Sequence, residues 1–429
     1  MDSRATGRGF HSRPSKRLSV ARPPWHPLGR LRHPLAAGPA APRGDPAPTA
    51  PLAVSPAAPA ASARGHRAGL RQFVLGPREL ATNLLRELSG GACSIGSMRL
   101  LVLGGTRFVG RAVVEAALAR GDEVVTVTRG VSGAPDQAAE VIHADRADPA
   151  AVRDALANRS WDAVIDTWSG APSAVRESAE ILADRAGHYG YVSSRSVYRW
   201  PVPVGLDETA PVVEGDARSD SSADYAAAKR GAELAVLEAI GDRALIARAG
   251  LILGPYEDVG RLPWWLRRIE RGGPVLAPGP PDRPLQFIDA RDLATWMLES
   301  AERGLGGVFN TVSAPGHATM GSLLATAVQE VGSDAELVWV SPEVILAAGI
   351  EPWTELPIWL PPTGEGAGLH AGDVTRAHQA GLRCRPAAET VADTWHWQQK
   401  EGNPQPPHAR AAPGLDPVKE QRLLATLKN

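Results

Sequence analysis

The sequence is poor in cysteine, in long apolar runs and in net charge. Only Cys93 and Cys384 occur among its 429 residues, too few for a disulfide framework and without the spacing of a metal site. No apolar run reaches the roughly 18 residues that a transmembrane helix needs. These absences argue against a disulfide-stapled secreted domain and a membrane-spanning helix. They favour a cytoplasmic protein that binds no metal.

Charge divides the chain near residue 97. Residues 1–97 contain 14 Lys and Arg against 4 Asp and Glu, whereas the remainder contains 32 against 43. The acidic remainder makes nucleic acid an improbable partner, because binding its backbone needs a basic face. The first 68 residues are rich in Pro, Ala and Arg, so we expect the segment 1–97 to be a disordered extension. A transit peptide is one reading of it, but we favour a natural start at Met98, directly before the first predicted strand.

A glycine turn between a strand and a helix organises the rest of the chain. Residues 100–103 are a continuous apolar run, typical of a parallel strand covered on both faces. The glycines that follow allow a sharp turn, a close approach to a pyrophosphate and tight packing of the next helix. The helix N-terminus then offers N–H groups to the phosphates. The predicted cofactor-binding turn consists of Gly104, Gly105, Thr106, Arg107, Phe108, Val109 and Gly110.

This turn resembles the Gly-x-x-Gly-x-x-Gly fingerprint of the extended short-chain dehydrogenase/reductases, with Arg107 in place of the middle glycine. The alternative is a glycine-rich turn in another α/β fold. The variant is most similar to an atypical branch described as NAD-dependent epimerase/dehydratase. That branch resembles both reductase-like members and chloroplast stem-loop RNA-binding proteins.

Two arginines lie where the adenosine end of a dinucleotide would bind. Enzymes that prefer NAD usually carry an acid after the second strand, to bind the ribose 2′-OH, but this chain has Arg129 there. Together with Arg107 it predicts NADP as the cofactor, because a guanidinium suits a 2′-phosphate. NAD is the alternative, with both arginines merely solvated. The resemblance implies that Asp145, after the third strand, contacts adenine; capping of the next helix is the other reading.

Short apolar strands alternate with amphipathic helices, which is typical of a doubly wound parallel sheet of the Rossmann type. We expect the NAD(P)-binding domain over 98–255, a smaller α+β substrate lobe over 256–400 with segments that return to the sheet, and a tail over 401–429. The later strands are predicted within residues 163–167, 188–198 and 244–255.

Tyr225 and Lys229 lie one turn apart on a predicted helix, so their side chains share a face. A nearby ammonium favours the phenolate of a tyrosine, whose unperturbed pKa of about 10 makes it a poor base at neutral pH. The resemblance implies that Tyr225 exchanges a proton with the substrate and that Lys229 also reaches the nicotinamide ribose. It further selects Ser194, four residues before Tyr198, to hold the substrate oxygen.

Some motifs are weaker. Asp166-Thr167-Trp168 replaces the polar motif that the family has after the fourth strand, so we expect a different proton relay. Asp289 is a good N-cap for the helix that follows it. Arg283 is either a turn residue or a contact for a substrate phosphate or carboxylate.

The sequence thus predicts an NADP-dependent oxidoreductase, or an epimerase or dehydratase, that acts on a secondary alcohol or ketone of a sugar-like small molecule. The rival interpretation is a non-catalytic dinucleotide-binding protein that recognises RNA or a protein partner. The presence of Ser194, Tyr225 and Lys229 favours the enzyme, whereas a basic surface groove would favour the rival. Substrate, direction and oligomeric state stay open, a homodimer being one arrangement.

Overall fold

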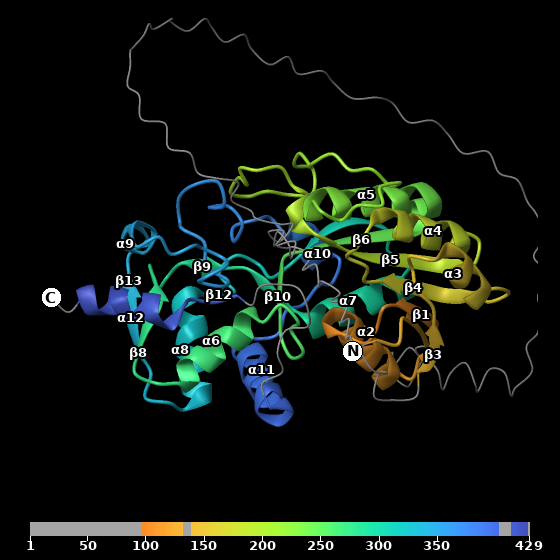
Figure 1. Ribbon diagram of the computed structural model, residues 1–429. Helices are drawn as coiled ribbons and strands as arrows, with labels where there is room; N and C mark the ends of the chain where they lie inside the picture. The colour runs from red at the N-terminus through yellow and green to blue at the C-terminus, as the bar shows by residue number, and fades with distance from the viewer. Residues whose placement is uncertain (1–96, 132–138, 403–412, 428–429) are drawn as a thin grey trace, which may run out of the picture. The chain divides into compact units, whose positions relative to one another are not determined.

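The computed structural model describes residues 97–131, 139–402 and 413–427 (Figure 1). All but the last residue of the predicted N-terminal extension therefore lies outside the described part. The largest sheet has seven parallel strands in the order β11-β6-β5-β4-β1-β2-β3. These strands are β1 (Arg99–Leu103), β2 (Glu123–Thr128), β3 (Glu140–His143), β4 (Trp161–Asp166), β5 (Ala186–Ser194), β6 (Ala244–Ala249) and β11 (Gly307–Thr311).

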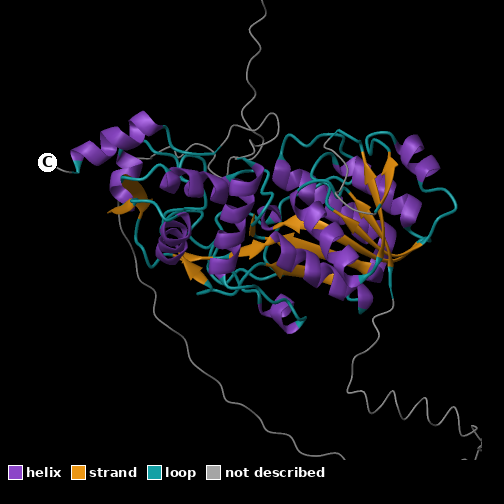
Figure 2. Cartoon of the chain, turned by 90° about the horizontal axis from the view of Figure 1, so that it is seen from below, coloured by secondary structure: helices purple, strands orange, loops and turns teal. Residues whose placement is uncertain are grey.

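Helices cover both faces of this sheet (Figures 1 and 2). Along β1, Leu100 and Val102 pack in one hydrophobic cluster and Leu101 in another, because successive side chains point to opposite faces. The first cluster includes side chains of α2 (Phe108–Arg120) and α7 (Ala290–Glu302). The second includes side chains of α3 (Pro149–Ala155), α4 (Pro172–Leu182) and α5 (Tyr225–Ile240). The predicted doubly wound Rossmann-type sheet is confirmed.

The strand order reverses at β1, which has β2 on one side and β4 on the other. The register pairs Leu103 with both Val127 and Asp166, so three strands end at nearly the same level. Connections leave in opposite directions at such a point, which opens a crevice beyond the carboxyl ends of the strands. This edge is where the sequence predicts cofactor and substrate to meet.

A separate hydrophobic cluster forms the C-terminal lobe, with Trp265 and Trp359 fully buried in it. Three two-stranded sheets pair β7 with β10, β8 with β13, and β9 with β12. The strands are β7 (Leu251–Leu253), β8 (Pro274–Pro278), β9 (Pro284–Leu285), β10 (Phe287–Asp289), β12 (Ala318–Thr319) and β13 (Glu336–Val340). The remaining helices are α6 (Arg261–Glu270), α8 (Met320–Val331), α9 (Pro342–Ala347), α10 (Thr375–Gln379), α11 (Ala387–Glu401) and α12 (Pro417–Thr426), with short 3₁₀ turns η1 (Arg195–Val197) and η2 (Gly241–Arg243).

Two predicted strands differ from the observed ones by more than a shift of one or two residues at an end. The fifth ends at Ser194, and η1 follows, because the Ser194 side chain accepts a hydrogen bond from the Ser196 N–H and caps that turn. The sixth is divided at Gly250 into β6 and β7, which belong to different sheets. A Cβ at Gly250 would lie 2.6 Å from a methyl group of Val312, so glycine permits the close approach of the chain after β11.

No helix of the described residues is both long and apolar enough to cross a membrane. The predicted N-cap at Asp289 is confirmed, since its carboxylate accepts from the Arg291 N–H at the start of α7. The helix α12 lies within residues 401–429, where the sequence predicts only a tail. Its Glu420 is buried and accepts from Arg268 Nε at 2.6 Å and from the Leu276 N–H at 3.1 Å.

We expect Glu420→Gln to lower the free energy of unfolding by about 3–5 kcal/mol, because it leaves the buried Arg268 without its carboxylate. Urea unfolding followed by tryptophan fluorescence measures the change. Gln421→Ala, at an exposed position of the same helix, should stay within about 0.5 kcal/mol of the unmodified protein. Equal small losses in both variants would show that the ion pair does not anchor α12.

Candidate active site

The turn between β1 and α2 is shaped by glycine. Gly104 and Gly105 have φ of 121° and 114°, a region that L side chains avoid. A Cβ at Gly104 would overlap Thr167 Oγ1, and one at Gly110 would lie 2.6 Å from the backbone nitrogen of Gly105. The Gly104 N–H donates to the Val127 carbonyl at 3.1 Å, which fixes the turn against β2. The backbone is therefore bare and close-packed where a pyrophosphate would approach.

The N-terminus of α2 is open to an anion. Arg107 occupies the N-cap position with an extended backbone and no capping hydrogen bond from its side chain, and the first turn has no acidic residue. The first N–H groups of a helix have no intrahelical partner and carry partial positive charge. Thr106 and Phe108 are half-buried, and Val109 packs into the sheet cluster. These residues fit the phosphates of a dinucleotide.

Arg107 and Arg129 are both exposed, and neither forms an ion pair with a carboxylate of the described residues. Arg129 directly follows β2 and Asp145 lies two residues beyond β3, on the same side of β1. The alternative reading of Asp145 as a helix cap is wrong. Asp148 caps α3, whereas the Asp145 carboxylate accepts from the Ala147 N–H at 3.0 Å. Its contact with adenine stays a prediction.

Lys229 is nearly fully buried, with 4% of its surface exposed. Its ammonium donates to the carbonyls of Trp168 and Val192, each at 2.7 Å, and lies 4.7 Å from the centre of the Tyr191 ring. Burial raises the pKa of Tyr191 well above its ordinary value, so this side chain stays a phenol and donates to the Trp168 carbonyl. Lys229 thus joins α5 to the ends of β4 and β5.

Tyr225 is the first residue of α5 and is half-buried. Asp224 caps the helix by accepting from the Ala227 N–H at 3.0 Å. Tyr225 therefore lies one turn before Lys229, at the N-terminal end of the helix, which runs on to Ile240. Tyr225 also lies near enough to Tyr191 for its charge to raise the pKa of that phenol, after burial and Asp166.

The two serines at the end of β5 have different surroundings. Ser193 is buried and donates to Glu233 Oε1 at 2.7 Å, which makes it part of the protein interior. Ser194 is half-buried, and among the described residues its hydroxyl forms hydrogen bonds only with the neighbouring Ser196. Of the two, Ser194 is the one whose hydroxyl can turn toward a substrate.

Two buried ionic networks that the sequence does not predict support this edge. In the first, Asp166 accepts from Arg146 Nη1 and Nη2 at 2.6 and 2.8 Å and from the Tyr189 hydroxyl at 2.8 Å. Asp166 also accepts from the Trp168 N–H at 2.9 Å, so it helps to fix the residue whose carbonyl accepts from Lys229. The motif that replaces the family's polar residues is therefore structural at Asp166.

The second network centres on Glu233, which accepts from Arg248 Nε and Nη2 at 2.9 Å and from Arg230 at 2.9 Å. Arg248 also donates to the Tyr198 hydroxyl, which donates to Asn310 of β11. Glu233 continues the four-residue spacing of Tyr225 and Lys229 along α5, a signal that could have located it. The pairing with Arg248 has no such local signal.

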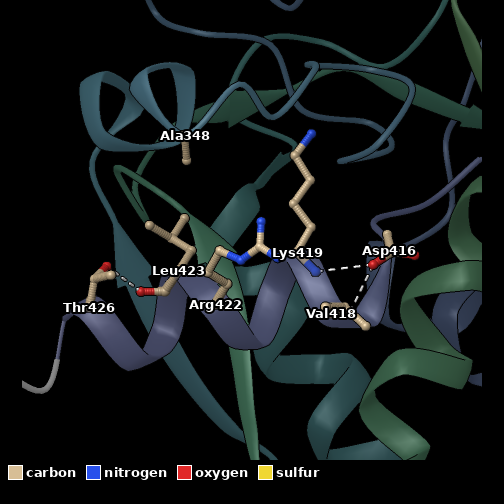
Figure 3. Close-up of a pocket in the computed structure, with 7 residues that line it drawn as sticks. All are labelled: Ala348, Asp416, Val418, Lys419, Arg422, Leu423 and Thr426. Carbon is tan, nitrogen blue, oxygen red and sulfur yellow. Dashed lines mark hydrogen bonds between the residues drawn. The ribbon is translucent and has the colours of Figure 1, made fainter.

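A cavity of about 450 Å³ lies elsewhere, against α12 (Figure 3). Its lining residues are Ala348, Asp416, Val418, Lys419, Arg422, Leu423 and Thr426, none of which belongs to the strand-end site. Lys419 donates to Glu355 and to the Gly349 carbonyl, so its charge is already compensated. We assign this cavity no part in the chemistry.

Several solved structures are similar to this chain. WbmH of Bordetella bronchiseptica in complex with NAD+ is 18% identical, with a TM-score of 0.53, over 71% of this chain and 99% of that one. WbmG of the same organism, in complex with NAD and UDP, is 15% identical, with a TM-score of 0.53, over 75% and 100%. UDP-glucose 4-epimerase of Thermotoga maritima, with UDP-glucose, is 18% identical, with a TM-score of 0.52, over 71% and 99%.

At these identities the structures show a shared fold, which spans nearly the whole length of each relative. No curated protein matches the sequence significantly. Residues 100–311, from β1 to β11, match the model of the NAD dependent epimerase/dehydratase family. Over these residues the chain belongs to the NAD dependent epimerase/dehydratase family.

Proposed function

We propose that the protein is an NADP-dependent oxidoreductase, epimerase or dehydratase that acts on a secondary alcohol or ketone of a sugar-like substrate. The observation that carries the proposal is the buried Lys229 ammonium. It is held between the carbonyl of Trp168 and that of Val192, which lies two residues before the end of β5, and Lys229 is one helical turn from Tyr225. Burying a lysine is costly unless its charge is well compensated. A lysine that only matched this spacing by chance would be expected on the surface, without such compensation.

In this proposal Tyr225 is the acid/base and takes a proton from, or gives one to, the substrate oxygen. The ammonium of Lys229 lowers the pKa of the phenol and also reaches the nicotinamide ribose. Ser194 donates a hydrogen bond to the same substrate oxygen, which fixes its distance from Tyr225. When bound, the nicotinamide dinucleotide would accept or donate the hydride.

The cofactor assignment rests on the turn and on the two exposed arginines. The open α2 N-terminus and the bare glycines fit a pyrophosphate. Arg107 and Arg129 would bind the 2′-phosphate that distinguishes NADP, and Asp145 the adenine. The WbmH and WbmG structures contain NAD, which supports a nicotinamide dinucleotide of either kind.

The sugar-like substrate is supported by the fold shared with a UDP-glucose 4-epimerase. A screen of nucleotide sugars and simpler secondary alcohols, read by the absorbance of reduced nicotinamide and by product analysis, tests the assignment. Cofactor binding without turnover on any of them would favour the dinucleotide-binding module. The low cysteine content is the ground on which we place the protein in the cytoplasm.

Arg129→Asp should weaken NADPH binding at least tenfold while NADH binding changes little. A charge-assisted hydrogen bond to a phosphate contributes about 1.5–3 kcal/mol, and tenfold corresponds to about 1.4 kcal/mol. Quenching of tryptophan fluorescence during cofactor titration measures both affinities. Arg153→Asp, an exposed arginine of α3, is the matched control. Equal affinity of the unmodified protein for both cofactors would refute the NADP preference.

Tyr225→Phe should lower turnover by at least two orders of magnitude with cofactor affinity within a few-fold, since general acid/base catalysis contributes about 10²–10⁴-fold. Lys229→Ala should weaken cofactor binding and move the activity profile to higher pH, because the phenol then ionises less readily. Lys400→Ala, an exposed lysine at the end of α11, should leave the profile in place. Near-full activity of Tyr225→Phe would exclude this mechanism.

Asp166→Asn should move the activity profile toward higher pH, as Lys229→Ala does, but by less. The substitution weakens the hydrogen bond to the Trp168 N–H and so the position of Trp168, whose carbonyl accepts from the Lys229 ammonium. It should also destabilise the protein by about 3–5 kcal/mol, because the buried Arg146 loses its carboxylate. Asp162→Asn, at an exposed position of β4, is the control. A destabilised variant with an unchanged pH profile would limit Asp166 to a role in folding.

A further inference from the structure

Arg195, the residue after Ser194, is buried with 5% of its surface exposed. Its Nη1 donates to the Leu369 carbonyl at 3.0 Å and to Gln286 Oε1 at 3.4 Å. Its Nε and Nη2 have no hydrogen-bond partner among the described residues. A Cβ at Gly372 would overlap this guanidinium, so the segment that covers it is bare of side chain there.

Arg195 differs from the other buried arginines of the described residues. Arg146 pairs with Asp166, Arg248 with Glu233, and Arg268 with Glu420. Arg195 forms no ion pair with any described carboxylate, and Glu208 acts on it only as a more distant charge. Burial lowers the pKa of Arg195 to about 10, so the side chain is still a cation at neutral pH. An uncompensated buried charge costs stability that a buried ion pair recovers in part.

A second arginine lies under the same covering segment. Arg283 donates from Nη2 to the carbonyls of Ala367 at 2.9 Å and Pro361 at 3.4 Å, and its Nε is also without a partner among the described residues. Burial foremost, and then the positive charges of Arg283 and Arg195, lower the pKa of His370 to about 4. The neutral imidazole accepts from the Gln286 N–H. Two cations and a neutral histidine therefore meet here, with no anion among them.

Clamping the segment 361–372 is one use of these guanidiniums, and the carbonyl contacts show that they do so. These carbonyl contacts do not balance the positive charges of the two guanidiniums, because a carbonyl compensates a cation less than a carboxylate does. It also leaves three donor nitrogens, Arg195 Nε and Nη2 and Arg283 Nε, without a hydrogen-bond partner among the described residues, whereas buried donors are almost always paired. A planar oxyanion would satisfy both needs, since the guanidinium fork matches it.

We propose that Arg195 and Arg283 bind an oxyanion, a carboxylate or a phosphoryl group, carried by the substrate close to its reacting carbon. The proposal rests on the function proposed above and narrows its substrate class to acids of this kind. Arg195 directly follows Ser194 in the chain, so the backbone joins this cluster to the proposed site. The rival outcome is that both arginines only hold the covering segment.

The test uses the full chain with two probes, inorganic phosphate and acetate, titrated by calorimetry at constant ionic strength with chloride. We expect at least one probe to bind and to raise the melting temperature, because a ligand of the native state stabilises it. Arg195→Gln and Arg283→Gln should each weaken that binding at least tenfold, and Arg195→Lys should restore part of it. Tighter binding of phosphate indicates a phosphoryl group, and tighter binding of acetate a carboxylate.

Arg243→Gln is the matched control, because Arg243 also donates to two backbone carbonyls, those of Ala186 and Ala183, away from this cluster. It should leave probe affinity unchanged. Binding of neither probe, or equal binding to the unmodified protein and Arg195→Gln, would overturn the proposal. Should Arg195→Gln fail to fold, Arg283→Gln and Arg195→Lys decide the question by the same comparison.

Failure here is separable from failure of the proposed function, because cofactor titration without any oxyanion tests only the latter. The titration is repeated with NADPH present, so that phosphate held by the α2 N-terminus is distinguished from phosphate held by Arg195. Oxyanion binding that depends on Arg195 without cofactor binding would preserve the site and discard the oxidoreductase. Cofactor binding without an effect of Arg195→Gln would do the reverse.

Discussion

Burial of the Lys229 ammonium is the constraint on which the candidate site depends. A charge in the interior needs acceptors on every side, and a helix cannot supply them from its own backbone. The carbonyls of Trp168 and Val192 do so because β4 and β5 end beside each other. The ends of β4 and β5 and the helix α5, which begins with Tyr225, are thereby fixed relative to one another.

The same rule of charge compensation explains the surrounding networks. Asp166 and Glu233 are each buried, and each is matched by a buried arginine with two hydrogen bonds. Both networks touch the strand ends, one through the Trp168 N–H and the other through Ser193. These arginine–carboxylate pairs are structural, and Arg195 differs from them because it is buried without a carboxylate. Compensation thus separates structural cations from those with room for a ligand.

The parts of the fold that were predictable from sequence are the local ones. Apolar runs, helical spacing and the glycines at 104, 105 and 110 specify strand, turn and helix within a few residues. The Asp289 cap could be predicted for the same reason, because it acts two residues away. The break at Gly250 could not, since it depends on the chain after β11 coming close. The end of β5 could not be predicted, because the Ser194 side chain accepts from the Ser196 N–H and so starts the turn η1 where further strand pairing was expected.

Site residues follow the same division. The spacing of Tyr225, Lys229 and Ser194 is legible because helix and strand geometry relate neighbours, although their roles stay a proposal. The groups that hold Lys229 are distant in sequence: the Trp168 carbonyl is 61 residues away and the Val192 carbonyl 37 residues away. No periodicity relates such positions, so only the folded chain brings them together. Arg195 could not be predicted because what distinguishes it, the lack of a carboxylate partner among the described residues, exists only in the folded chain.

The end of β5 and the segment after it are hydrogen-bonded to both the sheet and the lobe. Tyr198 donates to Asn310 of β11, Arg195 donates to the Leu369 carbonyl, and the Val202 N–H donates to the Glu365 carbonyl. One short stretch therefore carries the serine proposed for the reacting oxygen and the arginine proposed for an oxyanion. Because both are fixed by the same backbone, the distance between the reacting carbon and the acidic group of a substrate would be set by the protein. An acid of the wrong length could then satisfy one contact only by giving up the other.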